Sequence, residues 1–384
     1  MPIRRTRCSS RRPVSASARC PASTARRSPP ARCLAPSRPA SWRRTADSWA
    51  RTSSASSPAS SNNGIEGSVM PTVMTVNGPV DSSKLGFTLI HEHIFLDLRI
   101  DVWLSDRMLN VPETAFSELM LFKNAGGVTL VDQTPGGLRG NKNRILPIKH
   151  PLAIREMARR TGLNIVLGCG WYREPYYEPY LHRAKTDEIA EEIVRDVTVG
   201  IEGTDVKAGI IGEIGAHSNF VSAVEERVLR AAARAQKQTG VSLSTHQSEG
   251  DIAFDQLDIL EHEGVDLRRV ICSHIASGPS HEYAVAVAKR GPFVSIEGIG
   301  SFRPAYQENV IRRILHIIEK GYIDQLLLSH DVCVQPMYTV NGGGGYAYIS
   351  TQWLPLLKQR GLSDEQLHRI MVENPRRALT GERV

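Results

Sequence analysis

The sequence has 384 residues, of which 41% are hydrophobic, and its formal net charge is +7. This length and apolar content are sufficient for one large domain or two smaller domains with a sizeable core. No stretch approaches the roughly 20 apolar residues that a membrane-spanning helix needs, so we expect no membrane partner.

The first 69 residues differ in composition from the rest of the chain. They contain 13 Arg, no Lys, one Asp and one Glu, whereas the remainder has 34 basic and 38 acidic residues. The segment is rich in Ser, Pro, Ala and Arg and has too few large aliphatic residues to bury a core. We interpret residues 1–69 as a disordered tail, as a start site placed too early with Met70 or Met74 as the true beginning, or as a targeting segment. Residues 70–384 are then the folded domain, and a nucleic-acid partner is not expected because the basic charge belongs to the tail alone.

The six cysteines give no sign of a disulfide framework. Three lie in the tail, and the others, Cys169, Cys272 and Cys333, are far apart in the domain without a CxxC motif. Cysteine use of this kind is typical of a reducing compartment, so we expect a cytoplasmic protein.

From residue 85 onward, apolar runs of strand length alternate with segments of helical periodicity. The strand-like runs are, in chain order, 87–93, 128–134, 164–170, 209–215, 241–247, 270–275, 293–299 and 326–332. Continuously apolar runs that are each followed by a helical segment indicate parallel strands covered by helices. Eight such units in about 300 residues predict an α/β fold of the closed (β/α)8 (TIM) barrel type. A doubly wound open sheet is the alternative, but no GxGxxG motif follows the first strand.

Polar side chains recur where the predicted strands end, and in a (β/α)8 barrel this is the face that carries the active site. The strand ends carry His91, His93, Asp132, Cys169, Glu213, His246, His274, Glu297, His330 and Asp331. A single His in such a position is most often a hydrogen-bonded core residue. Four strands that each end in His, together with acidic residues, favour a divalent metal site instead.

The number of candidate ligands predicts two metal ions. The ligands divide into two sets along the chain: His91, His93 and Asp331, and then His246 with His274. Glu213 ends a strand between the sets, so its carboxylate can bridge the two ions. We expect two divalent transition-metal ions, with zinc as the first choice and manganese, cobalt or iron as alternatives. A water shared by two such ions has a pKa near neutrality, and Asp331 can accept or shuttle its proton as the catalytic base.

Six short motifs then carry a resemblance to a known family. They are HEH at 91–93, GIIGEIG at 209–215, STHQ at 244–247, CSHI at 272–275, LLLSHDV at 326–332 and ENPRRAL at 373–379. In this order, the motifs resemble the phosphotriesterase-related branch of the amidohydrolase superfamily over about residues 72–383. The resemblance implies a (β/α)8 barrel, a binuclear metal centre held by the six ligands named above, and a homodimer.

One departure from the family pattern bears on the substrate. Many members bridge the metals with a carboxylated lysine, whereas Gly212 falls on that position here and Glu213 follows it; Lys207 lies too early in the strand. The Glu form is similar to members that mostly hydrolyse esters, lactones or N-acyl compounds. The resemblance therefore implies a metal-bridging hydroxide that attacks a lactone, carboxylic ester or N-acyl amide of a small-molecule substrate. The alternatives are a phosphotriesterase, a mononuclear deaminase-like amidohydrolase, and a binding protein without catalysis.

Three further residues are candidates for contact with the substrate. Trp171 and Tyr172 follow the third predicted strand, where lactone-hydrolysing relatives place an aromatic residue near the metals. Either side chain could orient or protonate the leaving oxygen, and loop packing is the alternative. Arg303 could anchor an acidic substrate group, and an ordinary surface arginine is the alternative.

Overall fold

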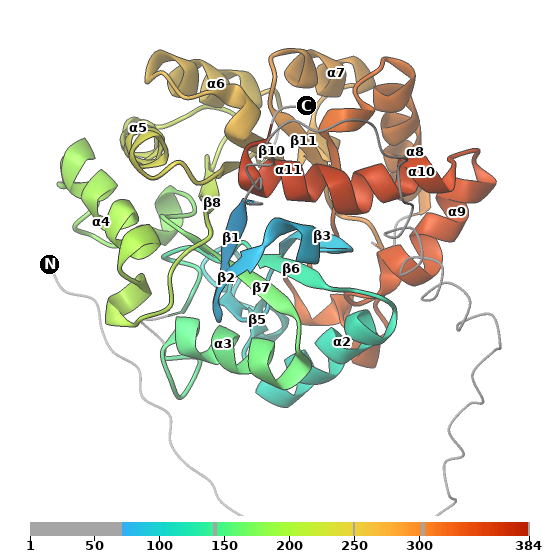
Figure 1. The fold of residues 1–384 in the computed structure, drawn as a ribbon. Helices are drawn as coiled ribbons and strands as arrows, with labels where there is room; N and C mark the ends of the chain where they lie inside the picture. The colour runs from blue at the N-terminus through green and yellow to red at the C-terminus, as the bar shows by residue number, and fades with distance from the viewer. Residues whose placement is uncertain (1–70, 141–143, 249, 301–303, 383–384) are drawn as a thin grey trace, which may run out of the picture. The chain divides into compact units, whose positions relative to one another are not determined.

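The computed structural model describes residues 71–140, 144–248, 250–300 and 304–382 (Figure 1). Its main sheet has eight strands, and the neighbouring strands pair in parallel. Their order follows the chain: β3 (Thr88–Glu92), β6 (Thr129–Asp132), β7 (Asn164–Cys169), β8 (Ile210–Gly215), β9 (Leu243–His246), β10 (Val270–Ser273), β11 (Phe293–Ile296) and β12 (Leu326–Leu328). Each strand lies within one of the ranges predicted from the sequence.

The first and last strands of the sheet meet and close it into a barrel. The backbone N–H of Asp331 donates to the carbonyl of His91 at 3.2 Å, and the His91 N–H donates to Ser329 Oγ at 3.0 Å. The buried carboxylate of Glu92 accepts from Ser329 Oγ and from the His330 backbone N–H, both at 2.8 Å. The predicted (β/α)8 barrel is thereby confirmed.

Helices follow the strands along the chain and cover the outside of the barrel (Figure 1). They are α2 (Pro112–Asn124), α3 (His150–Thr161), α4 (Thr186–Thr198), α5 (Ala223–Thr239), α6 (Ala253–His262), α7 (His281–Lys289), α8 (Pro304–Glu319), α9 (Leu354–Gln359), α10 (Asp364–His368) and α11 (Asn374–Thr380). Helix α5 shows how the local sequence sets these bounds: Ser222 and Glu225 form a reciprocal capping box at its start, and Gly240, with φ of 75°, ends it.

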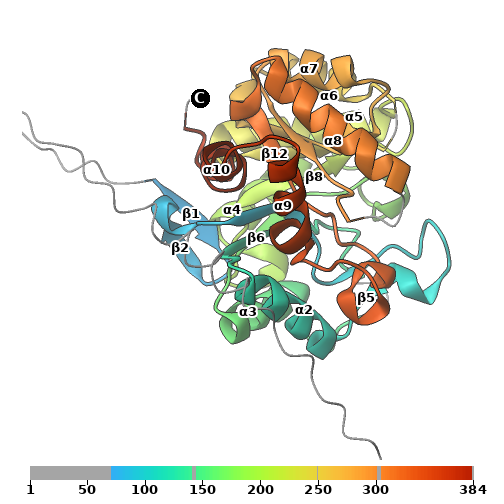
Figure 2. The same ribbon diagram turned by 90° about the vertical axis from the view of Figure 1, so that its right-hand side faces the viewer.

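Two short antiparallel hairpins, neither of them predicted, flank the barrel. Strands β1 (Thr72–Thr75) and β2 (Gly78–Asp81) form the first hairpin, and β4 (Leu96–Asp97) and β5 (Met108–Leu109) form the second. The Val76 N–H donates to the carbonyl of Ile165 near the start of β7 at 2.9 Å, which ties the first hairpin to the N-terminal end of the barrel. In Figure 2, β1 and β2 lie on one side of the barrel and β5 lies on the other.

Apolar side chains fill the barrel away from its C-terminal mouth. Seven of the eight strands each contribute one buried residue to a separate cluster: Ile90, Val131, Val166, Ile210, Ile271, Phe293 and Leu327. Val73 from the first hairpin and Ala378 and Leu379 from α11 belong to the same cluster and close this end. Among the described residues, no helix is long and apolar enough to cross a membrane.

Candidate metal centre

The C-terminal mouth of the barrel brings the predicted ligands together. Two compact groups of potential ligand atoms occur, each with all atoms within 4.8 Å of one another: His91, His93 and Asp331, and His91, Glu213 and His274. His91 Nε2 lies 3.2 Å from Glu213 Oε2, and His93 Nε2 lies 3.2 Å from Asp331 Oδ1. The first group is the set expected for the first ion, and the second shares His91 with it.

His246 lies beside the second group. Its ring centroid is 4.4 Å from that of His274, and its side chain is buried. Its Nδ1 has no hydrogen-bond partner among the residues described. His246 is therefore adjacent to His274, as expected for a shared ligand set, although it is not in either compact group.

The histidines share a pattern that fits metal ligation. Three of them place one ring nitrogen next to a protein hydroxyl: His91 Nδ1 with Ser273 Oγ at 3.1 Å, His93 Nδ1 with Thr134 Oγ1 at 2.9 Å, and His246 Nε2 with Tyr172 Oη at 3.0 Å. His91 Nε2, His246 Nδ1 and Glu213 Oε2 are buried without a hydrogen bond from any described residue, and His93 Nε2 faces Asp331 Oδ1 at 3.2 Å. Buried polar atoms without partners are costly, whereas metal-bound His rings have this one-sided arrangement. These nitrogen and carboxylate donors fit a divalent transition metal.

The charges within the cluster stabilise ionised carboxylates. Burial opposes a charge on His93, but Asp331 and Glu213 raise the pKa of His93 to about 9. Burial likewise opposes a charge on Glu213, yet His246 and His91 hold the pKa of Glu213 well below its usual value. The Glu213 carboxylate is therefore in the form that binds a cation.

The backbone of β8 explains why a carboxylate, and not a lysine, reaches the centre. Gly212 has φ of 137°, and a Cβ at this position would lie 2.5 Å from the Ser244 carbonyl oxygen. A lysine side chain is therefore incompatible with this backbone, and the next residue, Glu213, supplies the oxygens. Lys207 lines a pocket beside the β1–β2 hairpin, at the other end of the barrel.

Glu297 contributes to the centre in a way that the sequence did not reveal. Its Oε2 accepts from the His274 backbone N–H at 2.5 Å and lies 3.6 Å from His274 Nδ1. Its Oε1 lies 3.8 Å from His91 Nδ1. The sequence identifies Glu297 as an acidic residue at a strand end. Only the structure shows that its carboxylate lies next to the Nδ1 atoms of two candidate ligands, His274 and His91.

His330 and Glu92 are buried neighbours of the centre and are not among the compact groups. His330 Nδ1 lies 2.8 Å from Glu92 Oε1, and its Nε2 accepts from the Ile349 N–H at 2.9 Å. Both His330 nitrogens are thus used by the protein, so neither is free to bind a metal.

The structure separates the two aromatic candidates for substrate contact. Tyr172 is buried with its hydroxyl on His246, as described above. Trp171 packs at a ring-centroid distance of 6.4 Å from Tyr180 and pairs with Gly136 in an isolated bridge. Arg303 lies outside the described residues.

A (β/α)8 barrel with histidines and carboxylates gathered at its C-terminal mouth defines an enzyme of the amidohydrolase type. The chain belongs to the phosphotriesterase family, whose model matches residues 71–379. Because its relatives are named for hydrolytic activities, the chain is assigned as a hydrolase.

The similarity to individual relatives extends over almost the entire length of each relative. A phosphotriesterase homology protein of Mycobacterium tuberculosis is 34% identical over 335 residues, which cover 80% of this chain and 97% of the relative. An N-acetyltaurine hydrolase of Danio rerio is 28% identical over 350 residues, with 80% and 97% covered. The crystal structure of a lactonase from Listeria monocytogenes is similar with a TM-score of 0.74 and 27% identity, covering 81% of this chain and 100% of the lactonase.

Proposed function

We propose that the chain is a binuclear metal-dependent hydrolase that cleaves a lactone, a carboxylic ester or an N-acyl amide. The position of the Glu213 carboxylate carries this proposal. Its Oε2 lies 3.2 Å from His91 Nε2 and 3.6 Å from His274 Nε2, and its Oε1 lies 3.5 Å from His93 Nε2. A carboxylate placed between two groups of histidines is what a bridge between two ions requires. The names of the N-acetyltaurine hydrolase and of the lactonase support the substrate class.

The six ligands divide between two ions in this proposal. His91, His93 and Asp331 would hold one ion, His246 and His274 would hold the other, and Glu213 would link them. Bound divalent ions would supply Lewis acidity toward the substrate carbonyl and a water of lowered pKa. The donor set accepts zinc, which we expect first, and also manganese, cobalt or iron.

Asp331 is the best placed ligand to move a proton. Its side chain is 23% exposed, whereas those of His91, His93 and Glu213 are at most 3% exposed. Burial opposes the charge on Asp331, but the hydrogen bond from His93 and the nearby His274 hold its pKa below the usual value. An ionised carboxylate at the open edge of the cluster can accept a proton from the attacking water and release it toward the leaving group.

Tyr172 is placed to act on the leaving group. Burial keeps its pKa well above the ordinary value, so the phenol remains protonated. If His246 uses Nδ1 as a ligand, its Nε2–H donates to Tyr172 Oη, and the phenol proton is then available to the substrate. Contacts of Trp171 and Arg303 with substrate, a homodimer and a cytoplasmic location remain predictions.

The metal content of the full chain tests the binuclear scheme. We expect two equivalents of transition metal per chain in the wild type, and loss of at least one equivalent in Glu213→Gln. Glu118→Gln is the matched control, because Glu118 is a buried glutamate on α2 whose partners are Thr339 and Val340, away from the centre. One equivalent in the wild type, unaffected by Glu213→Gln, would contradict a Glu213 bridge.

A substrate panel tests the bond that is cleaved. The panel contains lactones, aryl esters, N-acyl amino acids, N-acyl aminosulfonates and phosphotriesters, each assayed with zinc, manganese and cobalt. We expect turnover of at least one carboxylic acid derivative at a kcat/KM well above that for any phosphotriester. A preference for phosphotriesters would reject the proposed substrate class and leave the metal scheme standing.

A further inference from the structure

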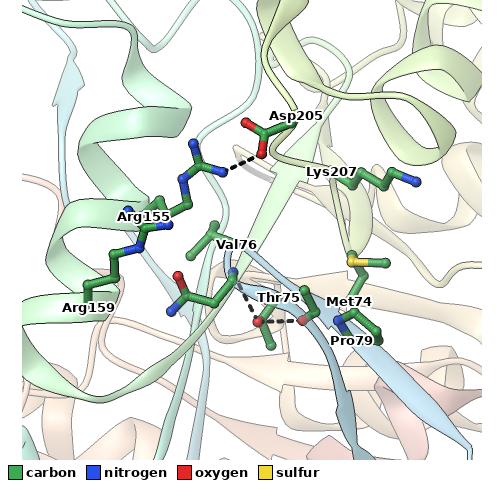
Figure 3. A pocket seen from close by; sticks show the side chains of 10 residues that line it. Met74, Thr75, Val76, Pro79, Arg155, Arg159, Asp205 and Lys207 are labelled. Atoms are coloured by element: carbon green, nitrogen blue, oxygen red, sulfur yellow. Dashed lines mark hydrogen bonds and ion pairs between the residues drawn. The ribbon is translucent and has the colours of Figure 1, made fainter.

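A cavity lies at the other end of the barrel, away from the candidate metal centre. It has a volume of about 330 Å³ and is bounded by the β1–β2 hairpin, by α3 and by the segment that precedes β8. Residues 74–79 of the hairpin form one side, and Arg155, Arg159, Asp205 and Lys207 supply the charged groups (Figure 3). None of these residues has a part in the proposed hydrolysis.

The charges in this cavity do not balance. Arg155 Nη1 lies 2.8 Å from Asp205 Oδ2, so these two side chains neutralise each other. For Arg159 and Lys207, no ion pair with any described residue is found, which leaves an excess of two positive charges around the cavity. Asp205 also interacts with the charge of Arg159, so the excess belongs to the group of four as a whole, and an excess of positive charge around one concave surface attracts anions from solution.

The hairpin gives the cavity an apolar and well-fixed side. Met74, Val76 and Pro79 line it, and Val76 is held to the barrel by its hydrogen bond to Ile165. The turn is fixed by Thr75, whose Oγ1 donates to the Gly78 carbonyl at 2.7 Å and accepts from the Asn77 N–H at 3.3 Å. A ligand with an apolar middle therefore meets a preformed surface.

The cationic groups stand on opposite sides of this apolar surface. Figure 3 shows Arg155 and Arg159 together on α3, and Lys207 on the other side of Val76 with its side chain extending away from the arginines. A ligand that satisfies both sides needs one acidic group for the arginines and a second for the lysine. We propose that this cavity binds a small organic dianion, with one acid group at Arg159 and the other at Lys207, and with its hydrocarbon middle against the hairpin.

The chain's own N-terminal segment does not fit as the occupant. The 69 residues before the domain contain 13 Arg and only two acidic residues, so they would add positive charge to a cavity that already has an excess. The occupant is therefore a separate molecule.

Calorimetric titration of the full chain with glutarate and adipate tests the proposal. We expect saturable binding at one site per chain outside the metal centre, and no binding of the neutral diamide glutaramide. Arg159→Gln and Lys207→Gln should each weaken this binding roughly tenfold, because each removes one charged partner of the ligand. Arg312→Gln is the matched control, since Arg312 is an arginine on α8 with a 67% exposed side chain that does not line the cavity.

A second arm separates this site from the metal centre, which also attracts carboxylates. Glu213→Gln should leave the glutarate binding at the hairpin unchanged, and Arg159→Gln should leave hydrolysis unchanged. Three results would overturn the proposal: no binding at millimolar glutarate, equal binding by wild type and both cavity variants, or loss of binding in Glu213→Gln alone. Thermal unfolding of each variant shows whether the fold is intact.

Discussion

Glu297 supports two candidate ligands without belonging to either compact group. Its carboxylate accepts a hydrogen bond from the His274 backbone N–H and lies next to both His274 Nδ1 and His91 Nδ1. A carboxylate in this position fixes the orientation of the rings and makes them stronger ligands.

The substitution Glu297→Gln removes this charge and retains the side-chain size. We expect metal affinity to fall by about 10- to 100-fold, as is typical when an outer partner of a ligand is lost. Competition with a chromogenic chelator measures the affinity, and Glu118→Gln again serves as the control. Wild-type affinity in Glu297→Gln would show that Glu297 has a packing role only.

Tyr172 and Trp171 are neighbours in sequence with different surroundings. We expect Tyr172→Phe to lower kcat by about 10- to 100-fold, because the hydroxyl on His246 is lost while the ring remains. Trp171→Phe, which keeps an aromatic ring against Tyr180, should change kcat little. Equal effects of the two substitutions would indicate that both residues act through loop packing.

His150 makes the stability of the protein depend on pH. Burial, together with nearby Arg139, lowers the pKa of His150 to about 3 in the folded state, whereas an unfolded histidine titrates near 6.5. Between these values the unfolded chain binds the extra proton, so the free energy of unfolding falls as the pH decreases below 6.5 and is unaffected above it. We expect this residue to account for about 1–2 kcal/mol of the stability lost between pH 7 and pH 5.

Urea unfolding of the wild type and of His150→Gln at both pH values measures this contribution. Glutamine retains a donor for the Phe95 carbonyl, which His150 Nε2 contacts at 3.0 Å, but does not titrate. The variant should lose less stability than the wild type on acidification. An identical loss in both proteins would contradict a buried neutral His150.

At the level of elements, the eight barrel strands could be predicted because both of their faces are buried. Such strands read as uninterrupted apolar runs, and β7, for example, is buried along all but its first residue. The hairpins escaped prediction because β4 and β5 have only two residues each, and β1 and β2 have four residues each with mixed exposure.

The candidate site could be predicted in outline for the same reason. Strand ends in a parallel barrel meet at one face, so the six candidate ligands could be named without a structure. Which atoms approach one another depends on ring orientation, and the sequence contains no signal for this. The sharing of His91 between two groups and the contacts of Glu297 therefore emerged only from the structure.

Strand β8 provides a test of how the backbone directs a ligand. Gly212→Ala places a Cβ against Ser244 at a positive φ, so we expect a loss of about 1–3 kcal/mol in unfolding free energy and reduced metal content. Gly162→Ala is the control, because Gly162 also has a positive φ, of 67°, but has no atoms within 4 Å of the added Cβ. Urea unfolding and metal analysis give the two readouts. Metal content equal to that of the control would contradict a strict requirement for glycine.

For the whole molecule, the apolar interior and the metal centre occupy different parts of the barrel. The cluster at the N-terminal end contains apolar residues from seven barrel strands, from α11, from the first hairpin (Val73) and Leu85, without any candidate ligand. We therefore expect the protein to retain its far-UV circular dichroism spectrum after chelation, while its activity is lost. We also expect Tm to fall, because the free energy of metal binding no longer stabilises the folded state. Return of activity on addition of metal would confirm reversibility, and unfolding on chelation would contradict this division.

The seam between β3 and β12 has a consequence for biosynthesis. The Glu92 carboxylate accepts a hydrogen bond from the backbone N–H of His330, which lies 238 positions later in the chain. Across the same seam, the His91 carbonyl accepts a hydrogen bond from the Asp331 N–H. During translation, the ribosome must release nearly the whole domain before the carboxylate of Glu92 finds its partners. A nascent chain without β12 and the residues after it lacks the Ser329 and His330 partners of Glu92 and the candidate ligand Asp331. We therefore expect hydrolytic competence to be acquired together with barrel closure, and chains that end before β12 to be unstable and inactive.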